Sequence, residues 1–247
     1  MPSTEPSKNF WQPGGMGLWR KAHETWEARS VHVHPAGSGS VVITVNGWIK
    51  SVQCAQQIVW TVLGNGEIEV STSWQPGEIP PPELPRFGMQ TTLRAGFDNL
   101  VWLGKGPQET YADRQAARVG LYRGKVKDQF FDYIKPQETG NKEAVRWLAL
   151  TDAHGRGVLA IGEPLLSANA LHASTEDLFS AQPTDNYYSY MLPKRETVTL
   201  NLDLKQRGVG GDDSWGALPH AQFGIVAAES YAAKAASRCW ARHPEHF

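Results

Sequence analysis

Residues able to do chemistry gather in two segments that lie far apart in the chain. The first runs from Trp102 to Arg114 and carries Glu109, Tyr111 and Asp113 after a Gly-Lys-Gly-Pro turn. Alternation along a strand would place these three side chains on one side, so that two carboxylates and a phenol lie beside a guanidinium. Such a group either fixes a loop through a buried ion-pair network or contacts a ligand directly. The residues alone leave both interpretations open.

The second segment joins glycines, turn-forming side chains and an indole. Its residues are Gly208, Gly210, Gly211, Asp212, Asp213, Ser214 and Trp215. Glycine permits backbone conformations that other residues resist, and short Asp and Ser side chains bond back to amides and fix turns. Adjacent aspartates diverge, which favours a turn over a facing catalytic pair. The indole either offers an apolar platform to a sugar ring or caps the core of the fold.

The elements that must position these segments are mainly β-strands. Gln57–Leu63 and Glu67–Trp74 flank Gly64-Asn65-Gly66, and the Asn-Gly pair predicts a β-hairpin. Alternating or β-branched runs predict further strands over 29–34, 40–45, 86–93, 100–103, 143–151, 157–162 and 197–204. The sequence therefore predicts an all-β, large antiparallel sandwich.

Two stretches favour helices, and the composition changes at both ends of the chain. Residues 174–179 and the Ala-rich run 227–238 consist largely of helix-compatible residues. We expect an irregular entry arm over 1–28, a single β-domain over 29–228, and a helical or disordered tail over 229–247. The five prolines between Pro76 and Pro85 exclude a helix or inner strand there and predict a stiff connector within the domain.

Composition excludes several classes of function. The 24 basic and 25 acidic residues give a net charge of −1, without the basic footprint that nucleic-acid binding needs. No apolar run approaches a membrane span or a signal core, so we expect no membrane contact and a cytoplasmic location. Two cysteines form no disulfide framework. His32 and His34 lie two apart without a third ligand nearby in sequence, so no metal site is predicted.

Several motifs occur in an order that resembles a known family. They are Asn9-Phe-Trp11, Gly106-Pro-Gln-Glu-Thr-Tyr-Ala-Asp-Arg114, Tyr133-Ile-Lys-Pro-Gln-Glu-Thr-Gly140, Val145-Arg-Trp147, Leu192-Pro-Lys-Arg195 and Gly208-Val-Gly-Gly-Asp-Asp-Ser-Trp215. Together they resemble the C-terminal, small-chain domain of glycoside hydrolase family 2 β-galactosidases. The resemblance implies a β-supersandwich related to galactose mutarotases, packed beside a catalytic TIM barrel. It also implies that Trp215 contacts the sugar or aglycone, and that Glu109 and Asp113 are structural. We therefore expect Trp215 to bind the substrate together with its neighbours Asp212, Asp213 and Ser214.

The sequence lacks what hydrolysis itself requires. Retaining glycosidases use two carboxyl groups about 5–5.5 Å apart, and in the resembled family both lie on the barrel. We therefore expect a non-catalytic domain or small subunit of a β-galactosidase, partnered by a barrel and a galactoside, with no cofactor on this chain. The alternative is a free-standing carbohydrate-binding or mutarotase-like module, for which His172 with Glu109 or Glu163 would supply an acid and a base.

Overall fold

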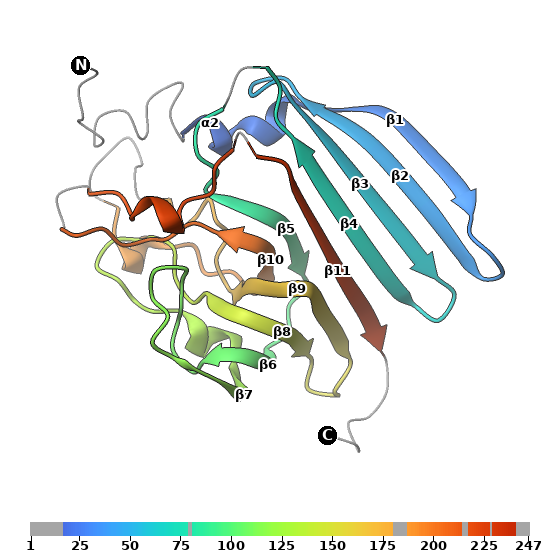
Figure 1. The fold of residues 1–247 in the computed structure, drawn as a ribbon. Helices are drawn as coiled ribbons and strands as arrows, with labels where there is room; N and C mark the ends of the chain where they lie inside the picture. The colour runs from blue at the N-terminus through green and yellow to red at the C-terminus, as the bar shows by residue number, and fades with distance from the viewer. Residues whose placement is uncertain (1–16, 79–80, 180–186, 214–216, 228, 241–247) are drawn as a thin grey trace. The chain divides into compact units, whose positions relative to one another are not determined.

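A computed structural model describes residues 17–78, 81–179, 187–213, 217–227 and 229–240. The elements in chain order are α2 (Gly17–Arg20), η1 (Ala22–Thr25), β1 (Trp26–Pro35), β2 (Ser40–Ile49), β3 (Cys54–Leu63), β4 (Glu67–Gln75), β5 (Arg86–Leu93), β6 (Asn99–Gly106), β7 (Arg118–Lys125), η2 (Val126–Gln129), β8 (Lys142–Thr151), β9 (Gly157–Leu171), η3 (Ser189–Met191), β10 (Val198–Gln206), η4 (Ala221–Phe223) and β11 (Tyr231–Trp240). The described helices are single turns (Figure 1). The predicted all-β, antiparallel class is confirmed.

The chain divides into two compact units. Unit 1 holds residues 1–87 and 204–237, and unit 2 holds residues 88–203 and 238–247. The boundaries between the units fall within three strands, β5, β10 and β11. The expected single domain over 29–228 stays a prediction.

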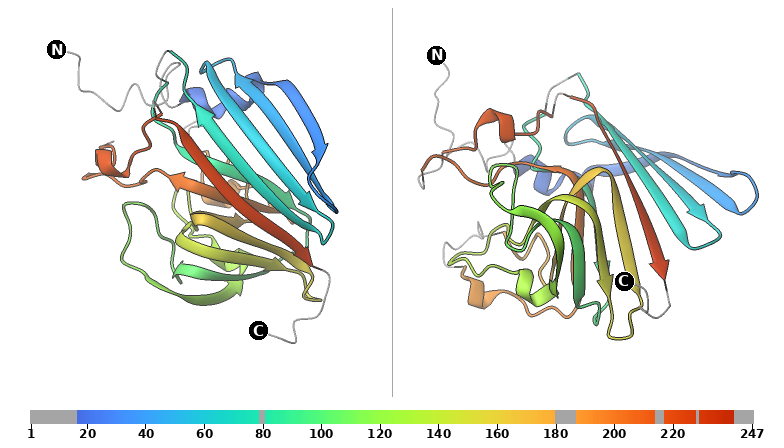
Figure 2. Two further views of the ribbon diagram at one scale, coloured as in Figure 1. Left: turned by 45° about the vertical axis from the view of Figure 1, so that its right-hand side comes forward. Right: turned by 60° about the horizontal axis from the view of Figure 1, so that its bottom comes forward.

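Unit 1 is built on an antiparallel meander. β1 to β4 pair in sequence order, β11 lies beside β4, and the two hairpins run side by side in both views of Figure 2. The hairpin expected over 57–74 is confirmed, because Gly66 has φ +88° and the Asn65 side chain accepts a bond from the Glu67 N–H at 3.0 Å. The entry arm is less irregular than expected, since β1 begins at Trp26 and Trp19 packs edge-on against Trp74.

Unit 2 carries both the first motif segment and the larger core. Its strands run β9-β8-β6-β7, and β10 pairs with β5 and β9. Trp102, Leu148, Leu150 and Leu200 are among its fully buried side chains. β7 was not predicted, because three of its eight residues are basic and two are glycine. Its pairing with β6 supplies the order that local sequence lacks.

Both helical predictions are wrong. The Ala-rich tail forms β11 rather than a helix over 231–240, because pairing with β4 outweighs the helix propensity of alanine. Residues 174–179 form a turn. The Asp177 carboxylate accepts from the Ser174 N–H at 2.7 Å while the Ser174 hydroxyl accepts from the Asp177 N–H at 3.1 Å, which closes the turn locally.

Candidate functional site

The first motif segment forms a charged centre in unit 2 that we call the Glu109 hub. β6 ends at Gly106, where a Cβ atom would lie 2.9 Å from the rings of Trp102 and Tyr122, so only glycine fits. The following residues are a turn rather than a strand, so the expected alternation is absent. The Glu109 carboxylate, 11% exposed, accepts bonds from five groups. They are the Gly140 N–H (2.8 Å), the Arg114 guanidinium (3.1 Å) and the hydroxyls of Thr139 (3.2 Å), Tyr111 (3.4 Å) and Tyr133.

These donors leave the Glu109 carboxylate no capacity for a substrate. A carboxylate offers about four lone-pair sites, and five donors already approach them. Tyr111 is fully buried, and burial together with the charges of Glu138 and Glu109 holds the pKa of its phenol above the usual range. The hub therefore favours the loop-fixing interpretation of Glu109, Tyr111 and Arg114 over direct ligand contact.

The backbone conformation at Gly140 directs one of the five donors, the Gly140 N–H, toward Glu109. Gly140 has φ +75°, and a Cβ atom there would lie 2.6 Å from the Gln129 carbonyl oxygen. Only glycine meets both conditions. The Gly140 N–H then points at Glu109, which ties the 130–140 loop to the turn after β6.

A buried lysine lies next to the hub. Lys142 is 2% exposed, its ammonium donates to the Gly140 carbonyl at 3.2 Å, and it lies 5.3 Å from the centre of the Trp102 ring. Burial lowers the pKa of Lys142 to about 8, although the charge of Glu109 opposes the shift. Nothing in the sequence singled out Lys142, because its burial depends on the strand pairing of β8.

The negative charge of Asp113 affects the pKa of a second carboxylate, that of Glu143. Glu143 accepts bonds from the Ser167 hydroxyl at 2.7 Å and the Asn141 amide at 3.0 Å. Burial raises the pKa of Glu143, and the negative charge of Asp113 adds to the rise. The structure thus brings Glu109, Tyr111 and Arg114 together and relates Asp113 to Glu143.

The glycine-rich segment lies in unit 1, and its backbone is fixed by close approach. The glycines with positive φ in the described chain lie outside residues 208–211. At Gly211 a Cβ atom would lie 2.1 Å from the Ala217 carbonyl oxygen, so no side chain fits. The Gly208 N–H donates to the Phe223 carbonyl at 2.8 Å. The segment therefore needs glycine for space at Gly211.

The two aspartates of this segment have different contacts. The Asp213 carboxylate accepts from the Ala217 N–H at 3.3 Å, a backbone bond of the predicted turn-fixing kind. Both Asp212 oxygens lie 3.0 Å from His220 Nε2, and this pair is exposed. Ser214 and Trp215 lie outside the described residues, so the predicted sugar contact stays a prediction.

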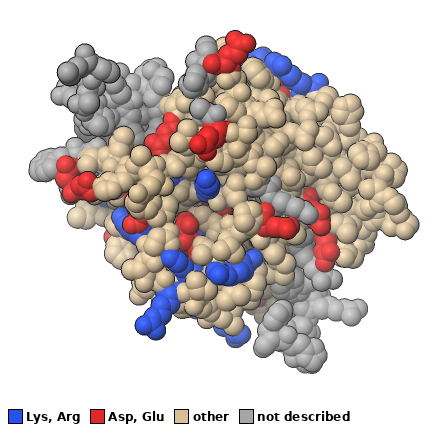
Figure 3. Space-filling model, in the orientation of Figure 1, with Lys and Arg blue, Asp and Glu red and all other residues tan. Residues whose placement is uncertain are grey.

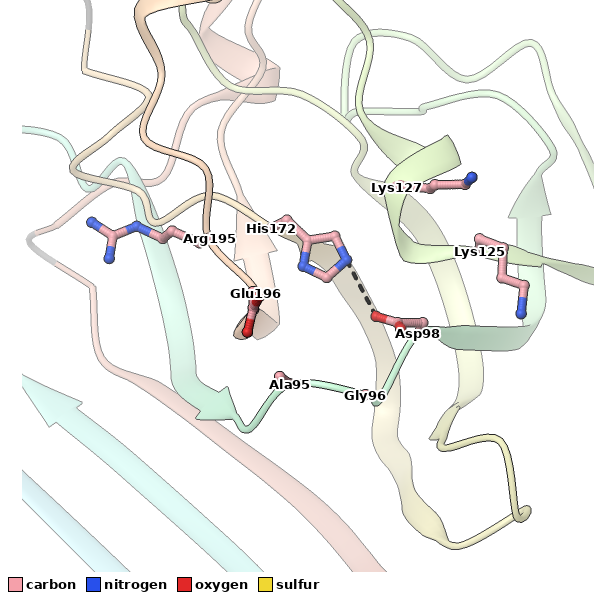
Figure 4. Close-up of a pocket in the computed structure, with 8 residues that line it drawn as sticks. All are labelled: Ala95, Gly96, Asp98, Lys125, Lys127, His172, Arg195 and Glu196. Carbon is pink, nitrogen blue, oxygen red and sulfur yellow. Dashed lines mark ion pairs between the residues drawn. The ribbon is translucent and has the colours of Figure 1, made fainter.

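A pocket of about 590 Å³ is lined by residues of unit 2 (Figure 4). In it His172 Nε2 lies 3.4 Å from the Asp98 carboxylate, while His172 Nδ1 lies 3.2 Å from the Thr197 carbonyl oxygen. The carboxylate facing His172 is thus Asp98, not Glu109 or Glu163 as imagined for mutarotase-like chemistry. Glu196 and Lys127 also line the pocket.

Charges elsewhere on the described chain are mixed. On the face drawn in Figure 3, basic side chains gather over unit 2 with acidic ones among them. The described residues contain no cluster of three metal-ligating side chains. No helix in the described part is long and apolar enough to cross a membrane.

The fold and the hub define an all-β, antiparallel protein in which buried carboxylates hold loops in place. Residues 5–235 match the family model described as beta galactosidase small chain. The chain belongs to the β-galactosidase small-chain family. The resemblance that the ordered motifs indicated is therefore confirmed.

Curated relatives of this chain are named β-galactosidases. The chain is 38% identical over 214 residues to the β-galactosidase of Priestia megaterium, covering 86% of this chain and 20% of that protein. It is 32% identical over 231 residues to the β-galactosidase of Halalkalibacterium halodurans, covering 91% of this chain and 22% of the relative. The chain thus spans about a fifth of the length of the relatives it matches.

Solved structures give weaker likenesses. The α-galactosidase AgaA of Geobacillus stearothermophilus has a TM-score of 0.46 at 7% identity, covering 88% of this chain and 28% of that chain. A GalM/aldose epimerase homologue from C. elegans has a TM-score of 0.41 at 9% identity, covering 87% and 69%. Neither likeness adds to the family assignment.

Proposed function

We propose that this chain is a non-catalytic part of a β-galactosidase, a domain or small subunit that completes the sugar pocket of a catalytic barrel held elsewhere. The observation that carries the proposal is the family match over residues 5–235. The filled Glu109 carboxylate supports it, because an occupied carboxylate is poorly suited to nucleophilic or acid/base work. The proposal assigns no cofactor to this chain and a cytoplasmic location.

In this proposal the glycine-rich segment presents Trp215 to the sugar or aglycone. The bonds between Gly208 and Phe223 and between Asp213 and Ala217 support it, since they join described residues that precede the tryptophan in sequence to described residues that follow it. An aromatic side chain has few rotatable bonds, so it loses little conformational freedom when a sugar packs on it. Binding of the sugar or aglycone by Trp215, away from the bond that is cleaved, orients the substrate for the barrel's own carboxylates.

A chimera tests the proposal directly. This chain replaces the matching 214-residue region of the Priestia megaterium enzyme, and hydrolysis of a chromogenic β-galactoside is measured. We expect activity in the chimera and none in the enzyme with that region deleted. A chimera that folds, by circular dichroism and sedimentation, yet fails to hydrolyse the substrate would overturn the proposal.

Within the active chimera, Trp215→Ala tests the role of the ring. We expect binding of glucose as acceptor to weaken by about 1–3 kcal/mol, the contribution of one aromatic platform. Trp215→Phe keeps a ring and should retain most of the affinity. Unchanged acceptor affinity in Trp215→Ala would remove Trp215 from the pocket.

The isolated chain provides the comparison with a free-standing module. Titration with galactose or lactose, followed by tryptophan fluorescence, should give no saturable change under the proposed function. Saturable binding by the chain alone would favour the module instead.

A further inference from the structure

The pocket in unit 2 contains charged side chains that the proposed function does not use. Its volume of about 590 Å³ lies within the range of about 300–1,000 Å³ that small-molecule sites occupy. The lining comes from four segments that are distant in sequence: the loop between β5 and β6, the start of η2, the residue after β9 and the stretch before β10. The fold therefore brings these charges together.

The ring of His172 is oriented by the backbone. Its Nδ1 lies 3.2 Å from the Thr197 carbonyl oxygen, and because a carbonyl oxygen only accepts, the Nδ1–H is the donor. Its Nε2 lies 3.4 Å from the Asp98 carboxylate, which also lines the pocket (Figure 4). That separation is long for a hydrogen bond, so both groups keep capacity for a ligand hydroxyl. The side chains are 27% and 49% exposed, so a ligand can reach them.

Lys127 and Glu196 supply two further charges. Both side chains are exposed, and within the described ranges neither has a hydrogen bond or ion pair to another residue. Figure 4 shows them on opposite sides of His172. An ammonium only donates hydrogen bonds and a carboxylate only accepts them. The pocket therefore offers a donor on one side and an acceptor on the other.

The segments that carry these charges are held in place. Val126, next to Lys127, is fully buried, and its N–H donates to the Asp98 carbonyl at 2.9 Å. The Arg195 guanidinium, which borders the pocket, donates to the Asp177 carboxylate through two nitrogens. The backbone of the pocket is thus fixed before a ligand binds, which lowers the entropic cost of binding.

The mixture of charges favours a neutral ligand that carries several hydroxyl groups. An anion would be repelled by Asp98 and Glu196, and a cation would be repelled by Lys127. A hydroxyl group both donates and accepts, so the hydroxyls of a sugar satisfy the carboxylates and the ammonium at the same time. A sugar ring also loses less conformational freedom on binding than an open chain of similar size.

We propose that this pocket binds a neutral monosaccharide, whose hydroxyls bond to His172, Asp98, Glu196 and Lys127. The inference goes beyond the proposed function, which places its sugar contact at Trp215, and does not rest on it. The residues that line the pocket include no tryptophan, so the fluorescence titration described above does not report on this site.

NMR of the histidine rings in the free chain tests the inference. D-Glucose and D-galactose are added separately at constant pH, and the His172 ring signal is assigned from its loss in His172→Gln. This signal should move saturably with at least one sugar, with a Kd on the order of millimolar. The signal of His154, exposed in the turn after β8, is the control and should stay in place. An unmoved His172 signal, or equal movement at His154, would overturn the inference.

Substitutions of single charges locate the bound sugar. Glu196→Ala and Lys127→Met should each raise the Kd about tenfold, the loss of one hydrogen bond to a charged group. Glu163→Ala, at an exposed glutamate of β9, is the matched control and should leave the Kd unchanged. The remaining histidine signals show that each variant is folded. Equal affinities in all three variants would place the sugar outside the pocket.

Other ligands and Trp215→Ala separate the remaining explanations. Inorganic phosphate and glycine should move the His172 signal no more than the His154 signal, and tighter binding of either than of both sugars would overturn the assignment to a monosaccharide. Trp215→Ala should leave the effect of the sugar on His172 unchanged, and loss of that effect would assign the sugar to the glycine-rich segment. An inactive chimera beside a normal His172 titration would overturn the proposed function alone.

Discussion

The free-energy cost of burying a charged side chain in unit 2 depends on the hydrogen-bond partners that are buried with it. Glu109 is surrounded by donors, so its negative charge is compensated within hydrogen-bonding distance. Lys142 is also buried, but its ammonium donates to a backbone carbonyl, that of Gly140, rather than to a carboxylate. A buried ammonium with so little compensation favours its neutral form. The hub therefore contains one well-paired charge and one that costs stability at neutral pH.

The lowered pKa of Lys142 makes stability depend on pH. A pKa of about 8 in the fold, against 10.5 unfolded, means that the unfolded chain binds more protons between those values. Stability should therefore rise as pH increases from 8 towards 10.5, and the full penalty, on the order of 3 kcal/mol, applies below pH 8. Urea unfolding at pH 7.5 and 9.5 measures the change.

Lys142→Met removes the titrating group while keeping a long side chain. The stability of the unsubstituted chain relative to this variant should improve by about 2 kcal/mol between pH 7.5 and 9.5. Lys127→Met, at an exposed lysine, should track the unsubstituted chain at both values. A pH-independent difference for Lys142→Met would mean that Lys142 is charged and well solvated in the fold.

At the scale of elements, strand β11 is a segment in which pairing with a neighbouring strand outweighs the local helix propensity of its residues. Tyr231 and Ala235 are buried whereas Ala232 is exposed, an alternation that fits a strand. Tyr231 also packs against Phe87 with ring centres 5.8 Å apart. The sheet of unit 1 therefore requires β11 as a strand, although its alanines would favour a helix in isolation.

Two alanines distinguish the strand from the helix. Residues 232 and 235 share a face in a helix but lie on opposite faces in a strand. Ala235→Asp should therefore cost more than about 3 kcal/mol of unfolding free energy, because it buries a charge, whereas Ala232→Asp should cost under about 0.5 kcal/mol. Denaturant unfolding of both variants is the measurement. Similar losses in the two variants would contradict the strand.

The sequence predicted those elements whose pattern is local. The hairpin at Asn65-Gly66 follows from turn chemistry, and β5 follows from an alternating run over Arg86–Leu93. By contrast, β10 has alternate apolar residues yet buries its polar face as well, because Asn201 bonds to Asn169 and Gln90. Such burial depends on neighbouring strands and leaves no local signal.

The candidate site was predictable in part for the same reason. The motif placed Glu109 near Tyr111 and Arg114 in sequence, and a turn brings them together. Tyr133 and Gly140 reach Glu109 from a different loop, so their contacts follow from the fold. The Tyr133–Gly140 motif in the sequence was the signal that could have linked them.

At the scale of the whole chain, one face of the β1–β4 sheet in unit 1 carries a row of apolar side chains across its strands. The register places Val33 opposite Ile43, Ile43 opposite Trp60, and Trp60 opposite Val70, so these side chains share a face. Val33 is 64% exposed at the edge strand β1. A net charge of −1 supplies little repulsion between copies. The isolated chain should therefore self-associate through this edge.

Val33→Lys tests that expectation against a matched change on the same strand. It adds one charge to the apolar face and should weaken self-association by about tenfold, the equivalent of exposing one valine contact. His32→Lys adds a similar charge to the opposite face and should leave association nearly unchanged. Sedimentation equilibrium at pH 7 over a range of concentrations measures both. Equal weakening would show that net charge governs association, and an unsubstituted chain that stays monomeric throughout would remove the apolar edge as its cause.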